Sequence, residues 1–155
     1  MVLRVVIGSD HGGYEMKKDL VGLLKELGHE VVDFGTHSTE PVDYPDVACL
    51  VATAVAREPG GSTVGIVIDG AGTGSAMTAN KVPGVRAAAC YDTFTARNSR
   101  EHNHANVLTL GSRNTGIEVA KEIVKVWLGT TFGGGRQLRR IEKMMQVERR
   151  FMREN

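Results

Sequence analysis

One short segment of the chain, residues 65–81, combines an apolar strand pattern, a carboxylate, a glycine-rich turn and the start of a helix. Residues 65–68 are apolar, Asp69 follows them, and glycine alternates with other residues up to Gly74. A helix is expected from there, over about 75–82. In an open parallel sheet, ligands bind beyond the carboxyl ends of the strands, where glycines let backbone N–H groups approach a ligand closely. The segment therefore predicts a cradle for an anion or a hydroxyl group, with Asp69 inside it.

Apolar runs and helical patterns alternate along most of the chain. Strands are expected at Leu3–Gly8, Glu30–Phe34, Val64–Ile68, Arg86–Cys90 and Asn106–Leu110. Helices are expected at Tyr14–Leu27, Pro45–Ala56, Ser75–Val82, Thr93–Glu101 and Gly116–Leu128. This repetition is typical of an α/β fold, a Rossmann-like three-layer sandwich whose five-stranded parallel sheet carries helices on both faces. The length of 155 residues predicts a single domain over residues 1–155.

The last segment departs from this pattern. After the glycines at 133–135, residues Arg136–Met152 form an amphipathic helical pattern with Ile141 and Phe151 on its apolar side. From Arg136 onward there are seven Arg or Lys against three Glu, a local charge of +4. Five strands and five helices already close the sheet, so we expect residues 136–153 to pack on a partner subunit. Packing against its own domain is the alternative.

The composition excludes several classes of function. A net charge of +1 gives no general attraction to nucleic acid or to a membrane surface. No apolar run approaches the roughly 20 residues that cross a bilayer, and no signal peptide is expected. Cys49 and Cys90 lack the spacing of metal ligands, and Gly8 lacks the dinucleotide-binding fingerprint after it. We therefore expect a cytoplasmic protein without metal or cofactor, and without a nucleic-acid or membrane partner.

Two acidic residues follow expected strands and are candidates for chemistry. Asp10 and His11 follow the first strand, where Asp10 suits sugar hydroxyls and His11 suits a phosphate. The alternative is that Asp10 only caps the next helix. Asp69 lies between an apolar strand and a glycine loop, which makes it a candidate general base. An aspartate after a strand also commonly just shapes a turn.

Histidine and arginine provide further candidates. His102 and Asn103 end the fourth expected helix, and histidine is suited to proton transfer near neutral pH. Arg113 follows the fifth strand, while Arg136 and Arg140 begin the last helix. Arginine suits bidentate recognition of phosphate. A solvated surface explains such residues equally well.

Taken together, these segments resemble the ribose-5-phosphate isomerase B family, which includes galactose-6-phosphate isomerase subunits. The resemblance covers nearly the whole chain and rests on six segments in the order of the family. They are Ser9-Asp10-His11, Val42-Asp43-Tyr44-Pro45, the run from Ala79 to Ala87, Arg100-Glu101-His102-Asn103, Gly111-Ser112-Arg113 and Gly134-Gly135-Arg136.

The resemblance implies a sugar-phosphate isomerase that uses neither metal nor nucleotide. It implies a homodimer, with pairing into a tetramer left open, whose active sites are shared between subunits. His102 would open the furanose ring, and a base would move a proton between C2 and C1 through a cis-enediolate. Substrate-binding residues implied by the match and by the glycine loop are Asp10, His11, Tyr44, Gly70, Ala71, Gly72, Thr73, Gly74, Asn103, Arg113, Arg136 and Arg140. Of these residues, Asn103 and Arg113 would come from the neighbouring subunit, together with His102.

The chain departs from the family at the expected base. Many members carry a cysteine at the position of Asp69, with a threonine at the position of Ala71, and others carry a glutamate at the position of Ser75. We therefore hypothesise that Asp69 is the base, and keep His102 and Ser75 as the other candidate catalytic residues.

Three functions remain open at this point. The first is isomerisation of ribose 5-phosphate, or of another tetrose, pentose or hexose phosphate, because the altered loop changes the pocket. The second is non-catalytic binding of a sugar phosphate on the same fold. The third, nucleotide binding, is disfavoured by the missing glycine fingerprint.

Overall fold

The computed structural model describes residues 1–152, so position 153 of the expected inter-subunit segment lies outside the described residues. Its strands are β1 (Arg4–Ser9), β2 (Glu30–Asp33), β3 (Thr63–Asp69), β4 (Ala87–Ala89) and β5 (Val107–Gly111). They form a parallel sheet in the order β2-β1-β3-β5-β4. A short 3₁₀ turn, η1 (His11–Gly13), follows β1. The helices are α1 (Tyr14–Glu26), α2 (Tyr44–Ala56), α3 (Thr73–Ala79), α4 (Thr93–Glu101), α5 (Ile117–Gly129) and α6 (Arg136–Phe151).

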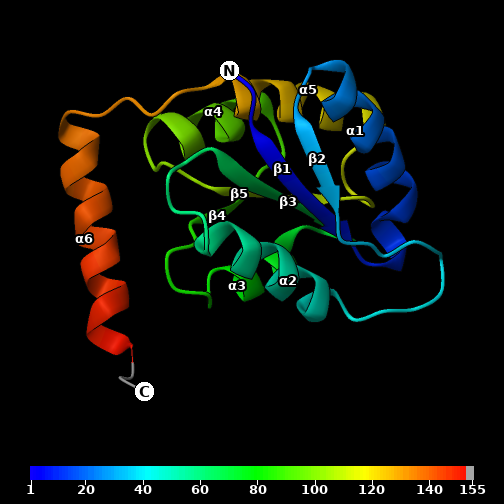
Figure 1. Ribbon diagram of the computed structural model, residues 1–155, viewed down its shortest axis with the longest axis horizontal. Helices are drawn as coiled ribbons and strands as arrows, with labels where there is room; N and C mark the ends of the chain where they lie inside the picture. The colour runs from blue at the N-terminus through cyan, green and yellow to red at the C-terminus, as the bar shows by residue number, and fades with distance from the viewer. Residues whose placement is uncertain (153–155) are drawn as a thin grey trace.

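Helices cover the sheet on both faces, which confirms the expected Rossmann-like architecture (Figure 1). One core lies between the sheet and helices α1, α4 and α5, and includes Leu20 and Trp127. The other lies between the sheet and helices α2 and α3, and includes Val51 and Ala79. The central strand β3 is buried along its whole length. A strand covered on both faces is expected to be mainly apolar, and β3 is apolar from Val64 to Ile68.

The order of the strands determines which strand ends meet. Strands β1, β3 and β5 are neighbours, with Ser9 opposite Ile68 and Asp69 opposite Gly111. The chain leaves β1 toward β2 on one side and returns to β3 on the other. Such a reversal opens a crevice beyond the carboxyl ends of the strands. The loops after β1, β3 and β5 therefore form one edge of the molecule.

The expected elements are all present, and most of their ends differ by one residue from the expected bounds, with a larger shift in α3. Helix α3 begins at Thr73 and ends at Ala79, whereas the sequence indicated 75–82. Its early start follows from Gly72, whose left-handed backbone lets the chain turn into the helix directly. Strand β4 is three residues long, because it is an edge strand that pairs only with β5.

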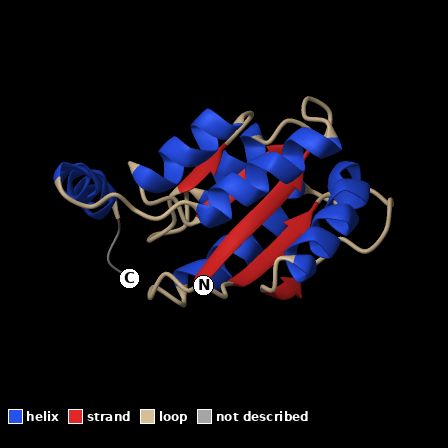
Figure 2. Cartoon of the chain, turned by 90° about the horizontal axis from the view of Figure 1, so that it is seen from above, coloured by secondary structure: helices blue, strands red, loops and turns tan. Residues whose placement is uncertain are grey.

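Helix α6 stands beside the rest of the molecule and is joined to it by an extended segment (Figures 1 and 2). Ile141 is buried, yet Leu138, Met144, Val147 and Phe151 expose 44–76% of their surface. The apolar side of α6 is thus only partly covered by its own chain. Among residues 1–152, no helix combines the length and the apolar character that crossing a membrane requires.

Candidate active site

The side chain of Asp69 is buried in the turn that follows β3. Its Oδ1 accepts a hydrogen bond from the N–H of Gly72 at 2.6 Å, and its Oδ2 accepts one from the N–H of Ser75 at 3.2 Å. Two backbone donors therefore fix the orientation of the carboxylate. The turn-shaping role that the sequence offered as the alternative for Asp69 is present, and a catalytic role stays a prediction.

Ser75 lies directly behind this carboxylate. The residue is fully buried, and among the described residues its hydroxyl has no hydrogen-bond partner. Its backbone N–H holds the carboxylate of Asp69. The catalytic role expected for Ser75 stays a prediction.

Close backbone packing shapes the loop around Asp69. Gly72 has a φ of 81°, and a Cβ there would lie 3.1 Å from the carbonyl carbon of Leu110. A Cβ on Gly111 would lie 2.6 Å from the carbonyl carbon of Ala71. The hydroxyl of Thr109 donates to the carbonyl oxygen of Gly72 at 2.6 Å. The loop is thus pressed against the end of β5, which leaves no room for side chains at either glycine.

The loop after β1 brings Asp10 and His11 to the same edge. The N–H of Asp10 donates to the carbonyl oxygen of Ile68 at 3.1 Å, which holds Asp10 at the end of β3. Its Oδ1 accepts from the N–H of Gly13 at 3.1 Å, so Asp10 does cap the following turn. His11 is exposed, and its Nδ1 accepts a hydrogen bond from the N–H of Val42 at 3.1 Å.

The loop after β5 supplies Arg113. The N–H of Ser112 donates to the carbonyl oxygen of Asp69 at 2.8 Å, and that of Arg113 donates to the carbonyl oxygen of Gly70 at 2.9 Å. A Cβ on Gly70 would lie 3.8 Å from Cδ of Arg113, so the arginine side chain lies along this loop. The resemblance assigned Arg113 to the neighbouring subunit, whereas here it lies beside the Asp69 loop of its own chain.

Tyr44 covers the first turn of α3 from the start of α2. A Cβ on Gly74 would lie 2.5 Å from two carbons of the Tyr44 ring, so the ring rests directly on this glycine. Tyr44 keeps 39% of its surface exposed. Thr73 and Gly74 are the first residues of α3, and their N–H groups have no acceptor within the helix. Tyr44 and these N–H groups therefore border the same part of the crevice.

His102 and Asn103 lie at the opposite edge of the sheet. Helix α4 begins beyond the carboxyl end of β4 and returns to the start of β5, which carries His102 away from Asp69. The Nδ1 of His102 lies 3.2 Å from the amide nitrogen of Asn98, and Asn103 donates to the side-chain oxygen of Asn98 at 3.2 Å. His102 and Arg136 line one cavity of about 310 Å³.

The predicted site residues thus fall into two groups within one chain. The edge beyond β1, β3 and β5 brings together Asp10, His11, Tyr44, Asp69, Gly70, Ala71, Gly72, Thr73, Gly74, Ser75 and Arg113. The other group consists of His102, Asn103, Arg136 and Arg140. Arg136 and Arg140 are four residues apart on α6 and so project from the same face of that helix.

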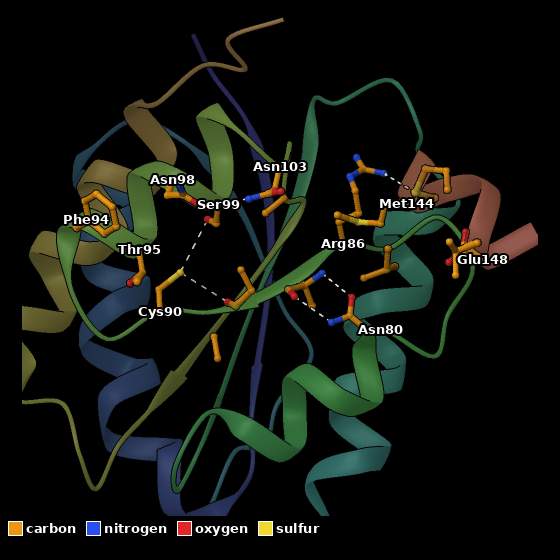
Figure 3. Close-up of a pocket in the computed structure, with 17 residues that line it drawn as sticks. Asn80, Arg86, Cys90, Phe94, Thr95, Asn98, Ser99, Asn103, Met144 and Glu148 are labelled. Atoms are coloured by element: carbon orange, nitrogen blue, oxygen red, sulfur yellow. Dashed lines mark hydrogen bonds between the residues drawn. The ribbon is translucent and has the colours of Figure 1, made fainter. Parts of the chain in front are cut away.

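A further cavity, of about 720 Å³, lies away from Asp69, between β4, α4 and the second half of α6 (Figure 3). Its walls are mainly apolar and include Met144 and the alanines of β4. Burial lowers the pKa of Arg86, against the opposing effect of Glu148, and burial raises the pKa of the Cys90 thiol. Glu148 is the only carboxylate in this lining. We therefore take the edge beyond β1, β3 and β5, which carries Asp69, as the candidate active site.

Several groups that hold the loop around Asp69 in place had no recognisable signal in the sequence. The hydroxyl of Tyr91 donates to the carbonyl oxygen of Ala71 at 3.0 Å, and the side chain of Asn114 lies 3.4 Å from the same oxygen. Thr109 lies within the expected strand Asn106–Leu110, and nothing in the sequence marks its hydroxyl as a contact to the loop around Asp69. The N–H of Val42 could not be recognised from the sequence, because it is a backbone group that a distant loop brings to His11.

Comparison with known proteins decides the family. Residues 5–144 match the family model described as Ribose/Galactose Isomerase. The chain belongs to this family. As a member of the ribose/galactose isomerase family, it is a sugar-phosphate isomerase, an enzyme that interconverts an aldose and a ketose.

Individual relatives in this family are similar over almost their whole length. The chain is 45% identical to ribose-5-phosphate isomerase B of Escherichia coli, over 95% of this chain and 97% of that protein. It is 38% identical to D-erythrulose-4-phosphate isomerase of Pectobacterium atrosepticum, over 95% and 96%. The solved structure of ribose-5-phosphate isomerase B from Clostridium thermocellum superimposes with a TM-score of 0.93, at 48% identity, over 97% of this chain and all of that one.

Proposed function

We propose that this isomerase converts ribose 5-phosphate to ribulose 5-phosphate. The observation that carries the proposal is the 45% identity to a ribose-5-phosphate isomerase B over 95% of the chain, together with a carboxylate at the strand exit of the crevice. Asp69, Asp10 and Arg113 there offer a base, a hydroxyl acceptor and a cation for a small phosphorylated sugar.

The proposed reaction begins with opening of the furanose ring by His102. Asp69 then takes the proton from C2, and the electron pair forms the double bond of a cis-enediolate. A second proton moves from the C2 hydroxyl to O1, and the Asp69 carboxyl returns its proton to C1. Two hydrogen bonds from backbone N–H groups hold the Asp69 carboxylate in place. They support this role, because the rate of proton transfer depends on the position of the base.

The remaining residues would bind the substrate. His11, Arg113, Arg136 and Arg140 would hold the phosphate, while Asp10, Tyr44 and Asn103 would contact the sugar. Backbone N–H groups of the glycine loop would stabilise the developing oxyanion. Since the N–H of Gly72 is already bonded to Asp69, the remaining N–H groups of the loop would carry that part.

Such a site needs two subunits. His102 lies at the opposite edge of the sheet from Asp69, so a neighbouring subunit would have to bring its own His102 to this Asp69. The partly exposed apolar side of α6 suits the corresponding homodimer, and a tetramer of two dimers remains open. We further propose that the protein acts in the cytoplasm, as a single domain without cofactor.

The direct test is proton NMR of the purified protein with ribose 5-phosphate in heavy water. Appearance of ribulose 5-phosphate with deuterium at the exchanging carbon would support the proposal. Absence of both product and exchange, with binding retained, would favour the second reading, a sugar-phosphate binding protein that does not catalyse.

One observation favours a different sugar. A relative with 38% identity is a D-erythrulose-4-phosphate isomerase, and the loop of this chain carries Asp69, Ala71 and Ser75 where many family members have other residues. The same NMR experiment with tetrose, other pentose and hexose phosphates separates these substrates. Turnover of one of them without turnover of ribose 5-phosphate would keep the reaction and change its substrate.

A further inference from the structure

The crevice contains one hydrogen bond that joins two of the predicted substrate-binding elements. The N–H of Val42 donates to Nδ1 of His11 at 3.1 Å, across 31 residues of sequence. A backbone N–H is only a donor, so Nδ1 of His11 has to be the acceptor. A ring nitrogen that accepts carries no proton, and a neutral imidazole then carries its proton on Nε2.

We infer that the Val42 N–H is a positioning group, which holds His11 as the neutral tautomer with the proton on Nε2. His11 then meets the substrate as an uncharged hydrogen-bond donor. This role rests on the proposed function, in which His11 binds the phosphate.

The loop that carries Val42 is itself anchored at both ends, so the bond is built into the fold. At one end, Gly35 accepts from the N–H of Ser9 at 2.7 Å, and the N–H of Thr36 donates back to Ser9 at 2.8 Å. At the other end, the loop runs directly into α2, which begins at Tyr44. Val42 is therefore held between the end of β1 and the helix that supplies Tyr44. Its N–H couples the placement of His11 to that of Tyr44.

The inference is tested first on the unmodified protein, without any substrate. In ¹⁵N-labelled protein, an N–H···N hydrogen bond gives a through-bond coupling between the two nitrogens, and we expect a cross-peak between Val42 N–H and Nδ1 of His11. His29 is an internal reference, because its Nδ1 accepts from the N–H of Leu3 at 3.0 Å, away from the crevice. A cross-peak for His29 without one for His11 would overturn the inference.

Two variants at one position then test the effect on the substrate. Val42→Pro removes the N–H, whereas Val42→Ala keeps it and serves as the matched control. We expect the KM for the sugar phosphate to rise about fivefold in Val42→Pro only, as for the loss of one hydrogen bond, with kcat changed less than about twofold. Equal KM values in the two variants would contradict the positioning role.

These two tests separate the inference from the proposed function. The cross-peak needs no turnover, so its presence supports the hydrogen bond and the tautomer even if ribose 5-phosphate is not the substrate. If the protein isomerises ribose 5-phosphate but shows no cross-peak for His11, the proposed function stands and the inference fails.

Discussion

The carboxylate of Asp69 combines a structural contact with the proposed chemistry, and the two can be separated by substitution. Asp69→Asn keeps one oxygen to accept from the N–H of Gly72, but an amide cannot accept the substrate proton. We expect kcat to fall by about 10² or more, as for loss of a general base, with sugar-phosphate binding retained. Steady-state kinetics and a binding titration measure the two effects.

Asp92 provides a matched control for this substitution. It also follows a strand and holds a turn, since its carboxylate accepts from the N–H of Thr95 at 2.7 Å, and this bond lowers the pKa of Asp92. Asp92→Asn should cost stability without a loss of kcat. If Asp69→Asn keeps near-normal turnover, Asp69 only shapes the turn and the proposed mechanism is wrong.

His104, which lies between α4 and β5, is expected to make the stability of the fold depend on pH. Burial, together with Arg86 and Arg100, lowers the pKa of His104, and its ring stacks on Phe132 at 4.5 Å. Because the folded pKa lies below that of the unfolded chain, the unfolded state binds the proton first as pH falls. Stability is therefore lost as pH drops below about 6.5.

We predict that His104→Asn reduces this loss. Asparagine tolerates the φ of 49° at this position, so the backbone remains compatible. The drop in Tm between about pH 7 and pH 5.5 should be smaller in His104→Asn than in the unmodified protein. His37→Asn, at an exposed histidine, is the control. An unchanged drop in Tm for His104→Asn would remove His104 as the cause.

At the scale of elements, the sequence predicts what local chemistry determines. The apolar run before Asp69 indicated β3, and the alternating glycines indicated the turn after it. The start of α3 was misplaced by two residues because Gly72 and the Asp69 carboxylate set it, and neither effect shows in a helical pattern. The order of the strands also depends on tertiary packing.

Strand order explains which parts of the site were foreseeable. Asp10, Asp69 and Arg113 each follow a strand, so the sequence marked them as candidates before their strands were known to be neighbours. His102 was a candidate too, but its distance from Asp69 follows only from the direction of α4. The Val42 N–H could not be predicted, because a backbone donor at the end of a loop leaves no pattern in the sequence.

The turn between β3 and α3 depends on the backbone of Gly72, which a substitution can test. Gly72→Ala introduces a Cβ at a left-handed φ of 81° and 3.1 Å from the carbonyl carbon of Leu110. We expect a loss of about 1–3 kcal/mol in the free energy of unfolding, and weaker activity because the turn holds Asp69. Denaturant unfolding and kcat measure the two effects.

Gly22→Ala is the matched control for this prediction. Gly22 lies within α1, and a Cβ there would meet no atom within 4 Å. The same chemical change should therefore raise stability by about 0.5–1 kcal/mol. Equal effects at Gly72 and Gly22 would show that the backbone at Gly72 is not specially constrained.

At the scale of the whole molecule, one chain does not bring all predicted site residues together. The group that includes Asp69 and the group that includes His102 lie at opposite edges of the sheet. Helix α6, which carries Arg136 and Arg140, is set apart from the body of the chain (Figure 1). It leaves a largely apolar cavity of about 720 Å³ beside β4. A second copy of the chain would cover this surface and unite the two groups, and mixing of variants tests that arrangement.

The test combines two subunits that are each inactive. Asp69→Asn removes the proposed base from one subunit, and His102→Asn removes the ring-opening group from the other. If each site takes Asp69 and His102 from different subunits, a mixed dimer contains one site with both residues intact and one with neither. Random re-association of equal amounts should then restore about a quarter of the unmodified activity, because half of the dimers are mixed and half of their sites are intact. If each site lies within one chain, mixing restores no activity, and the shared site is wrong.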